Sequence, residues 1–449
     1  MRQPAPTEVP VVCTVGASDS GGGAGVQADL KTLEAHGVFG ASVVSAVAAT
    51  TQHARGDSTH VLPVDAVETQ LDAVLADFDV DAVKTGTLAS RQVVETVTEY
   101  ARDIECPVVV DPVLAAPDDG LPSDTGDTGD AYEALVAEAT LVTPNVDEAE
   151  RLTGVRPDDE AGQRLAGQRL LTKGADAALV TGGHVPGEEV LATLVTPDAI
   201  EPATHPRVDC ATHGAGAALS AAVAARLASG EPLPEAVGQS LAFVERAVRY
   251  AYDVGEGPGA VHHAVDVRND AARDRVREQV EAVVAWFVER DVSPVVPEVG
   301  LQVVGATPYA ESPADCAAVE GRITSVRDGV HPNRSVRFGA SSHVARFLVA
   351  AREHAPALRY AVNCRFDDDV AAAIDALGWD WTAFGPREGP AAESHGPDGR
   401  ADRAFSDRET PPVAVADRGA VGTEPVVVVV GRDHRTVAER VVALVERLA

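Results

Sequence analysis

The sequence predicts an α/β fold, a doubly wound parallel sheet followed by a second, smaller α/β domain at the C-terminus. The chain has 449 residues, which is too long for one ordinary core. Short apolar runs alternate with helical patterns from residue 9 to about residue 200. A glycine-rich segment, DVGEGPGAVHHA, then breaks the pattern, and we place the domain boundary after it, giving domains at 1–265 and 266–449.

The first domain begins with apolar runs that read as buried strands. They are VPVVCTVGAS, GASVVSAVAA, DAVKTG, PVVVDPV and ATLVTPN. Between the first two runs, VQADLKTLEAHG has Val26, Leu30 and Leu33 at helical spacing, and Gly37 is its expected stop. Residues 201–250 become helical, with GAGAALSAAVAARLASG as one helix. Strand–helix alternation of this kind predicts ligand sites at the carboxyl ends of the strands.

The second domain begins with a predicted amphipathic helix over residues 269–290. Its apolar face carries Val276, Val280, Val283, Val284 and Phe287. A further helix begins at His343, with Val344, Phe347, Leu348 and Ala351 on one face. The domain closes with a strand, EPVVVVVG, and a helix, TVAERVVALVERLA. Residues 386–411 are rich in Gly, Pro, Asp and Arg, which predicts a loop.

The charge balance is strongly acidic. Asp and Glu number 69 against 37 Lys and Arg, a formal net charge of −32, and the lysines are Lys31, Lys84 and Lys173. Such a surface fits a very salty cytoplasm, where salt screens self-repulsion, although an acidic protein of an ordinary organism is the alternative. We expect no nucleic-acid partner, because binding a polyanion needs a basic face.

The remaining composition indicates a folded cytoplasmic protein. The chain is 45% hydrophobic and 24% charged, and no apolar run reaches the length of a membrane span. We therefore expect no membrane partner, and MRQPAPTEVP lacks the features of a secretory signal. The five cysteines show no CxxC and no zinc-ligand spacing, so neither disulfides nor a zinc site is expected.

Four glycine-centred segments carry the chemical signal of the first domain. They are SDSGGGAG from Ser18, KTGTL from Lys84, TGGH from Thr181 and THGAGA from Thr212. Glycines let a backbone approach a ligand closely, and a helix start favours anions. Consecutive amides in the last segment would form a hole for a transferring phosphoryl group. A tight turn or an ordinary helix start explains any one of these segments equally well.

Seven motifs follow one another along residues 10–265: GASDSGGGAGVQADLKT, VKTGTLA, VVVDPV, TPNVDEA, VTGGH, THGAGAALSAAVAA and GPGAVHH. In this order they resemble the hydroxymethylpyrimidine and phosphomethylpyrimidine kinases of the ribokinase superfamily. The resemblance implies a ribokinase-like fold, the cofactors ATP and Mg²⁺, and small pyrimidine substrates. Folds of this class often pair, so a homodimer is a candidate assembly.

The implied pyrimidine contacts are Ala24, Asp29, Gln52 and Thr87. The implied ATP and magnesium residues are Asp111, Asn145, Glu148, Thr181 and Gly183, with Asp111 and Glu148 as metal ligands. The implied anion hole comprises Gly214, Ala215, Gly216 and Ala217. Without the family, Asn145 and Glu148 could simply cap a helix.

The chain departs from the family's pattern at several positions. Ala217 stands where these kinases usually carry Cys and the wider superfamily carries Asp, and alanine cannot accept a proton. Thr181 replaces a lysine and Thr87 a methionine, while Gln52 matches the family's glutamine only with an insertion. Cys210 and His213 lie near the missing base without aligning to it. The domain is thus a weak kinase, a kinase with a substituted base, or a non-catalytic holder of pyrimidine phosphates.

The second domain contains an arginine and a histidine in suggestive positions. Arg322 follows a glycine in a short apolar segment, and His343 opens a helix. A guanidinium suits diphosphate through paired hydrogen bonds, and an imidazole can donate to a leaving group. From spacing alone, a surface or core role for both residues is the more common case.

Three segments carry a second resemblance: VEGRITSVRDGVHP, the segment from VRFGASSHVAR to AIDALGW, and PPVAVADRGAVGTEPVVVVVG. They resemble the archaeal thiamine-phosphate synthase domain, and the match covers residues 275–449. The resemblance implies that Arg322 and His343 are the catalytic pair joining hydroxymethylpyrimidine diphosphate to hydroxyethylthiazole phosphate. Implied phosphate contacts are Ser341, Ser342, Arg346, Asn363 and Arg365. Arg387 has no clear assignment.

The leading hypothesis is therefore a bifunctional transferase of thiamine biosynthesis. One alternative keeps the synthase and makes the first domain a substrate-binding scaffold, which Ala217 and Thr181 favour. Another is a ligand sensor, because related synthase-like domains act in regulators. Those domains lack the catalytic Arg and His, which this chain retains.

Overall fold

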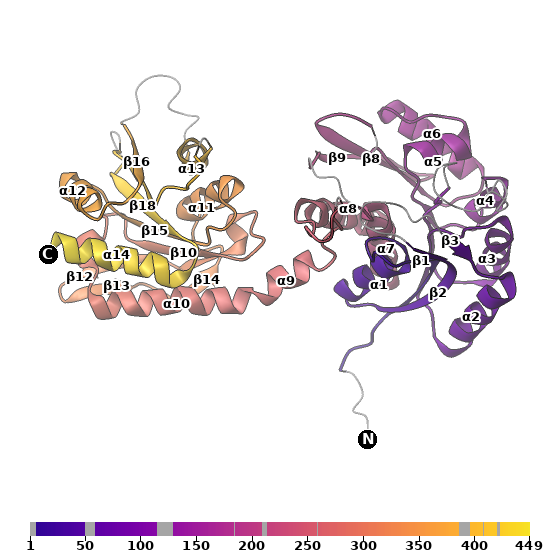
Figure 1. Ribbon diagram of the computed structural model, residues 1–449, viewed down its shortest axis with the longest axis horizontal. Helices are drawn as coiled ribbons and strands as arrows, with labels where there is room; N and C mark the ends of the chain where they lie inside the picture. Colours follow the sequence, from indigo (N-terminus) through magenta and orange to yellow (C-terminus); the bar gives the residue numbers. More distant parts are fainter. Residues whose placement is uncertain are drawn as a thin grey trace. The chain divides into compact units, whose positions relative to one another are not determined.

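The structure is a computed structural model that describes residues 6–49, 59–114, 129–183, 185–208, 213–257, 259–385, 396–406, 408–419 and 423–449. The chain forms two compact units, Met1–Val265 and Asp266–Ala449 (Figure 1). None of the helices in these described ranges combines the length and apolar character that a membrane crossing requires.

The first unit is built on a nine-stranded sheet. Its strands are β1 (Val11–Asp19), β2 (Phe39–Ala48), β3 (Thr59–Val61), β4 (Ala82–Thr85), β5 (Val108–Val110), β6 (Leu141–Val142), β7 (Ala178–Thr181), β8 (Glu189–Val195) and β9 (Ile200–Pro206). They lie in the order β3-β2-β1-β4-β5-β6-β7-β8-β9. The pairs from β2 to β7 are parallel, and β3, β8 and β9 extend the edges antiparallel.

Helices cover both faces of this sheet, as the sequence predicts. They are α1 (Gly25–Ala35), α2 (Val64–Asp77), α3 (Arg91–Asp103), α4 (Gly129–Val136), α5 (Val146–Thr153), α6 (Glu160–Thr172), α7 (Ala215–Ala228) and α8 (Leu233–Arg249). One buried cluster joins α2, α3 and α4 to the sheet through residues such as Val97 and Leu135. Another joins α1, α7 and α8 to the opposite face through Leu33, Leu219 and Val237. The prediction of a doubly wound α/β fold is confirmed.

Strand β9 corrects one detail of the prediction. Residues 201–250 read as helical, but β9 reaches Pro206 before α7 and α8 begin. This strand, IEPATHP, lies at the sheet edge and is almost wholly exposed, with two prolines in its sequence. Edge strands tolerate proline and need no continuous apolar run, so the usual sequence signal of a strand is missing here.

The second unit is a seven-stranded, mainly antiparallel sheet with a separate hairpin. Its strands are β10 (Gln302–Ala306), β11 (Cys316–Val319), β12 (Ile323–Val326), β13 (Gly329–Pro332), β14 (Val336–Phe338), β15 (Tyr360–Arg365), β16 (Trp381–Phe384), β17 (Ala414–Asp417) and β18 (Val426–Gly431). The sheet order is β14-β11-β10-β15-β18-β17-β16, and β12 pairs with β13. Only β16 and β17 run parallel among the described pairs of this sheet.

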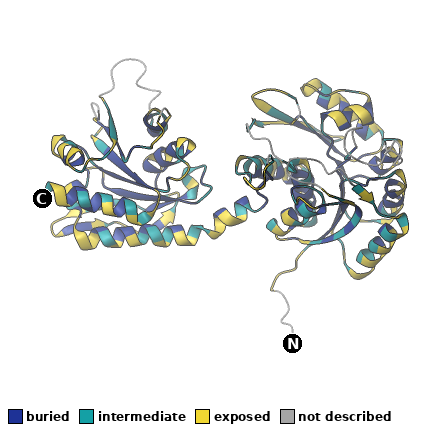
Figure 2. Cartoon of the chain, in the orientation of Figure 1, coloured by how far each residue is buried: buried dark blue, intermediate teal, exposed yellow. Residues whose placement is uncertain are grey.

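Helices again cover both faces of the second sheet. They are α9 (Val265–Ala271), α10 (Arg273–Arg290), α11 (His343–His354), α12 (Asp368–Ala376), α13 (Pro397–Phe405) and α14 (His434–Leu448). The predicted apolar faces of α10 and α11 are buried (Figure 2). Helices α10, α12 and α14 share one core cluster, while α11 and α13 share the other.

Helix α13 corrects the loop predicted over residues 386–411. Residues 386–395 and 407 lie outside the described part, but Pro397–Phe405 forms a helix. Pro397 suits the first turn of a helix, and the apolar residues Ala401, Ala404 and Phe405 pack in the cluster that contains α11. Tertiary packing therefore outweighs the low helix propensity of Gly399.

Candidate active sites

The glycine-rich segment after β1 is a tied loop. The Asp19 carboxylate accepts hydrogen bonds from the amides of Gly21 at 2.8 Å and Ala24 at 2.7 Å. Lys31 on α1 donates to the carbonyl oxygen of Gly22 at 2.6 Å. The amide of Ala24, a predicted pyrimidine contact, is thus hydrogen-bonded within the loop.

This loop touches the start of α7. Gly214 precedes the helix with a φ of +93°, and a Cβ at that position would lie 1.8 Å from the carbonyl oxygen of Gly23. Any side chain would collide with the loop, so only glycine fits. The predicted anion-hole residues 214–217 form the N-terminal turn of α7, whose first amides have no partner inside the helix. A Cβ on Gly216 would meet nothing within 4 Å.

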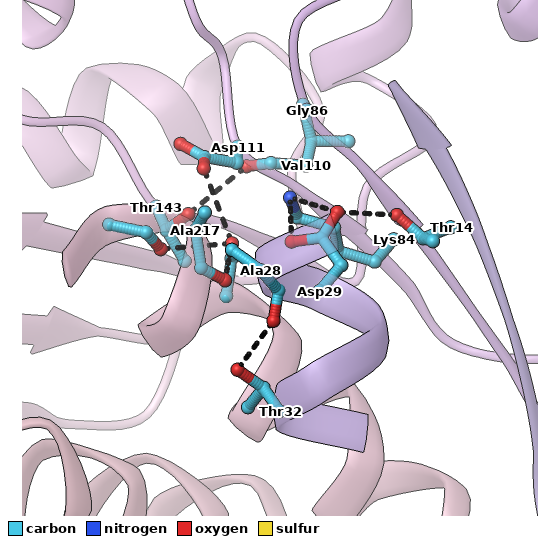
Figure 3. A network of polar contacts seen from close by, with 12 residues as sticks. Thr14, Ala28, Asp29, Thr32, Lys84, Gly86, Val110, Asp111, Thr143 and Ala217 are labelled. Atoms are coloured by element: carbon cyan, nitrogen blue, oxygen red, sulfur yellow. Dashed lines mark hydrogen bonds and ion pairs between the residues drawn. The ribbon is translucent and has the colours of Figure 1, made fainter. Parts of the chain in front are cut away.

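A buried ion pair lies between α1 and β4. Lys84 donates to both oxygens of Asp29, at 2.9 and 3.0 Å, and Thr14 donates to the same carboxylate at 2.6 Å (Figure 3). Asp29, a predicted pyrimidine contact, is 1% exposed. The structure therefore gives its carboxylate partners within the protein.

Asp111 lies directly after β5 and beside the first turns of α7. Ser220 donates to its carboxylate at 3.2 Å, and the same hydroxyl reaches the carbonyl oxygen of Ala217 at 3.2 Å (Figure 3). Burial raises the pKa of Asp111, with Lys84 opposing the rise and Asp29 adding to it. The structure thus brings together Asp29, Asp111 and Ala217 from distant parts of the sequence.

Asn145 and Glu148 form a capping box at the start of α5. The Asn145 side chain accepts from the Glu148 amide at 3.0 Å, and Glu148 accepts from the Asn145 amide at 2.9 Å. Burial raises the pKa of Glu148 to about 8, and the negative charge of Asp111 contributes to that rise. The capping role is real, and it leaves two buried, mutually repelling carboxylates.

Two neighbouring carboxylates suit a divalent cation, because Mg²⁺ is usually held by one or two carboxylates together with substrate phosphates. Asp111 and Glu148 therefore fit the predicted metal role in donor type, burial and charge. No cluster of three or more His, Cys, Asp or Glu side chains able to hold a metal ion occurs within the described ranges.

The loop after β7 is organised by an arginine that the sequence analysis did not single out. Arg207 donates to the carbonyl oxygens of Gly183 and Gly187, each at 2.8 Å, and of Val185 at 2.5 Å. Thr181 ends β7 and bridges to Asn145, so the two predicted ATP segments are adjacent. The guanidinium of Arg207 thus lies in the loop that lacks the family's lysine. No pattern in the sequence predicted this contact.

Other predicted residues of the first unit have less informative surroundings. The carbonyl oxygen of Thr87 accepts a hydrogen bond from Ser45 at 2.7 Å. His213 forms an isolated bridge with Ala260. Gln52 and Cys210 lie outside the described residues.

In the second unit, several strand ends meet at one edge of the sheet. Asn363, near the end of β15, pairs with Gln302 at the start of β10. Arg365 at the end of β15 pairs with Val426 at the start of β18, which also pairs with Asp417 at the end of β17. The turn containing Arg322 follows β11 at the same edge, because β11 runs antiparallel to β10.

Neighbouring residues hold the backbone and the side chain of Arg322 in place. Its backbone has a φ of +65°, an uncommon conformation for a residue with a side chain. Its guanidinium donates to the carbonyl oxygen of Val299 at 2.5 Å. A Cβ on Gly300 would lie 3.1 Å from the Cβ of Arg322, so the arginine stem packs on that glycine.

His343 is the first residue of α11 and is exposed. Partial removal of water lowers the pKa of its imidazole, and the positive charges of Arg400 and Arg322 lower it further. Asp417 acts in the opposite direction. The predicted pair, Arg322 and His343, therefore lie within electrostatic range of each other.

Arg400 and Asp417 are functional candidates that the sequence analysis missed. They form an ion pair whose side chains are each 8% exposed. Arg400 belongs to α13, inside the segment predicted to be a loop, so nothing in the sequence pattern pointed to it. Both residues act on the pKa of His343.

The predicted phosphate contacts have unequal support. The buried side chain of Asn363 accepts from the Gln302 amide at 2.6 Å and donates to the Gly300 carbonyl oxygen at 3.2 Å. Both ends of its amide are thus bonded to backbone. Arg346 forms an exposed ion pair with Asp398.

The other three predicted contacts differ in exposure and in partners. Ser341 is buried, whereas Ser342 is exposed and makes no capping hydrogen bond with its side chain. Arg365 pairs with Asp367 and lines a cavity of about 830 Å³. The cavity wall also includes Val299, the residue whose carbonyl oxygen holds Arg322. Arg387 lies outside the described residues.

Comparisons with known proteins match these two units separately. The family model described as phosphomethylpyrimidine kinase matches residues 19–262, more than half of the chain. The model described as thiamine-phosphate synthase ThiN matches residues 279–443.

Among curated proteins, the chain is 42% identical over 267 residues to the thiamine biosynthesis bifunctional protein ThiED of Geobacter sulfurreducens, covering 58% of this chain and 54% of that protein. The chain thus spans about half the length of this relative. It is 43% identical to the hydroxymethylpyrimidine/phosphomethylpyrimidine kinase of Streptomyces coelicolor, covering 58% of this chain and 96% of that kinase. Among solved structures, the pyridoxal kinase of Staphylococcus aureus in complex with AMP-PCP and pyridoxal has a TM-score of 0.54 at 28% identity, covering 58% of this chain and 96% of that one.

Proposed function

Because this chain belongs to the phosphomethylpyrimidine kinase family and carries a thiamine-phosphate synthase domain behind it, we propose that it catalyses successive steps of thiamine biosynthesis. The two domains make it a transferase of that pathway. In the proposed sequence, the first domain phosphorylates hydroxymethylpyrimidine and then its monophosphate with ATP. The second domain joins the diphosphate to hydroxyethylthiazole phosphate.

The coupling reaction is a substitution at the pyrimidine methylene carbon. The bond from that carbon to the diphosphate oxygen breaks, and its electron pair leaves on the diphosphate. The lone pair of the thiazole nitrogen forms the new bond, giving thiamine phosphate and free diphosphate. Catalysis therefore requires positioning of the reactants and stabilisation of the departing negative charge.

Arg322 and His343 suit these two needs differently. Arg322 is permanently charged and would neutralise the departing diphosphate. The lowered pKa of His343 keeps its imidazole neutral near neutral pH, where it still has one N–H to donate to an oxygen. The observation that supports the proposal is that the positive charge of Arg322 lowers the pKa of His343, although the two residues come from separate segments.

In the first kinase reaction, the alcohol oxygen attacks the terminal phosphorus of ATP and the bond to ADP breaks, whereas in the second a phosphate oxygen of the monophosphate attacks. The alcohol proton must pass to an acceptor. A Mg²⁺ ion held by Asp111 and Glu148 would neutralise phosphate charge. The N-terminal amides of α7 would hold the transferring group, and Arg207 would fix the loop over the nucleotide.

Ala217 favours a second candidate function for the first domain. Its side chain cannot accept the alcohol proton, and the nearby carboxylates of Asp29 and Asp111 are engaged by Lys84 and Ser220. In this alternative the first domain binds pyrimidine phosphates without phosphorylating them, and the second domain remains a synthase.

An assay of the purified full chain separates these functions. One reaction supplies pyrimidine diphosphate with thiazole phosphate, and the other supplies hydroxymethylpyrimidine, or its monophosphate, with ATP and Mg²⁺. The bifunctional enzyme turns over both, the scaffold only the first, and a ligand sensor neither. Arg322→Ala and His343→Ala should each remove most coupling, on the order of 10²-fold or more, while thermal stabilisation by hydroxyethylthiazole phosphate persists. Wild-type rates in both variants would overturn the site assignment.

We further propose a cytoplasm of high salt concentration as the working environment. The net charge of −32 supports this proposal, because salt screens the repulsion among surface carboxylates. The assays should accordingly be run across a range of KCl concentrations. Stability that falls as KCl rises would contradict it.

A further inference from the structure

Arg322 depends for its orientation on the segment 298–302. The guanidinium donates to the carbonyl oxygen of Val299 at 2.5 Å, and the stem lies against Gly300. The backbones are also joined, since Leu301 and Ile323 exchange two hydrogen bonds of 2.8 Å. A shift of this segment would therefore displace the arginine.

Two side chains from other parts of the fold clamp this segment. Glu424, before β18, accepts hydrogen bonds from the amides of Glu298 at 2.6 Å and Val299 at 2.9 Å, one on each carboxylate oxygen. Asn363, on β15, holds the carbonyl oxygen of Gly300 at 3.2 Å and the amide of Gln302 at 2.6 Å. The clamp acts on both sides of the glycine that supports Arg322.

The negative charge of Glu424 does not suit contact with the phosphate groups of the substrates. Both substrates of the proposed coupling are anions, and Glu424 lines the adjacent cavity. A carboxylate there repels phosphate groups, so its presence has to be explained by something else. Bidentate acceptance from two successive amides is a strong, charge-assisted contact, and it acts on the segment that holds Arg322.

We propose that Glu424 is a positioning residue for Arg322, acting through the amides of residues 298 and 299. The proposal rests on the synthase function proposed above. Asn363 completes the clamp from β15, which accounts for the polar side chain buried at that position. Neither residue touches the reacting atoms; together they fix the angle at which the guanidinium meets the leaving group.

Glu424→Gln tests the proposal, with Glu298→Gln as its matched control. Both side chains line the same cavity, and both variants remove one negative charge. Only Glu424→Gln removes a carboxylate oxygen that accepts a backbone amide. Loss of charge alone should leave the binding of inorganic diphosphate unchanged or tighter, whereas a displaced Arg322 should weaken it.

We expect Glu424→Gln to lower kcat for coupling about tenfold, with a smaller change in KM, because misplacement by ~1 Å can cost ~10²-fold. Its diphosphate affinity should fall, while Glu298→Gln should bind diphosphate at least as well as the wild type. In an Arg322→Ala background, Glu424→Gln should change diphosphate affinity no further. Equal effects of the two glutamine variants, or an undiminished effect in the Arg322→Ala background, would overturn the inference.

Two further measurements keep the test decisive. Thermal unfolding shows whether Glu424→Gln is folded, and if it is not, Glu424→Asp keeps the charge and shortens the reach, so it should reproduce the fall in kcat. If the wild type does not couple the substrates at all, the proposed function fails. In that case, calorimetry of diphosphate binding still tests the positioning role of Glu424. That role is also refuted if the wild type, Arg322→Ala and Glu424→Gln bind diphosphate with the same affinity.

Discussion

Lys84 and Asp29 form an ion pair in the interior of the first unit, with the lysine nitrogen 2.9 and 3.0 Å from the two carboxylate oxygens. Their side chains are 2% and 1% exposed. Lys84 is one of only three lysines in the chain. A buried pair of this kind contributes little net stability while intact, but removing one partner leaves an uncompensated charge.

Lys84→Met should therefore destabilise the first unit by about 3–5 kcal/mol, because Asp29 would remain buried without its cation. Urea unfolding followed by circular dichroism measures the change. All three tryptophans lie between residues 286 and 381, so the tryptophan fluorescence transition follows the second unit and should stay in place. Lys173→Met is the control, since the exposed pair of Lys173 with Glu133 is worth ~0–1 kcal/mol. Equal losses in the two variants would contradict the prediction.

Glu148 makes the stability of the first unit depend on pH. Its pKa is raised from the ordinary 4.5 to about 8 in the folded protein, so the folded state binds the proton more tightly than the unfolded state between these values. Stability should fall as pH rises through this window, by about 1.4 kcal/mol per pH unit at most. Glu148→Gln cannot ionise and should flatten the pH profile. Urea unfolding of both proteins between pH 5 and pH 8 measures the slopes, and parallel slopes would refute the assignment.

The pKa of His343 should respond to its neighbours in a fixed order. Arg400 lowers it more than Arg322, and Arg346 has the smallest effect of the three. Arg400→Met should therefore raise the pKa of His343 more than Arg346→Met does. NMR titration of the His343 ring proton, assigned with His343→Asn, measures both shifts. The reverse order would show that α13 does not place Arg400 beside the imidazole.

Ala217→Cys tests the missing proton acceptor. Ala217 lies in the first turn of α7, which is predicted to hold the transferring phosphate, and the Ser220 hydroxyl reaches both its carbonyl oxygen and the Asp111 carboxylate. Restoring a general base typically gains ~10²–10⁴-fold, so we expect a clear increase in the ATP-dependent phosphorylation rate. Ala218→Cys, one residue further along the helix, is the control. An unchanged rate in Ala217→Cys would mean that the reaction does not lack a base at this position.

The sequence was sufficient for the doubly wound fold and for the faces of the long helices. Val276 and Phe287 recur at helical spacing and are buried as that spacing requires. It was insufficient where packing between distant segments decides the structure. Helix α13 contains Gly399 and several charged residues, and only its contacts with α11 make it helical. The exposed edge strand β9 lacked an apolar pattern for the same reason, since its stability comes from pairing with β8.

The sites show a similar division. Glycine-rich turns after strands, such as that of Gly214, are visible in the sequence because backbone conformation restricts residue type. Residues that act through one contact carry no such signature. Arg207 donates to three carbonyl oxygens of a loop 20 to 24 residues away in sequence, and Glu424 binds a segment more than a hundred residues away. The two backbone hydrogen bonds of Asn363 likewise depend on the strand register and could not be predicted from the sequence.

The fit between Gly214 and the carbonyl oxygen of Gly23 has a consequence for engineering and for evolution. With 1.8 Å from an added Cβ to that oxygen, no second residue type can occupy position 214 unless the loop after β1 is rebuilt. The loop after β1 and the first turn of α7 therefore fit together in only one relative position. Grafting either segment from a relative without the other would break both, so the two should be exchanged only as a pair.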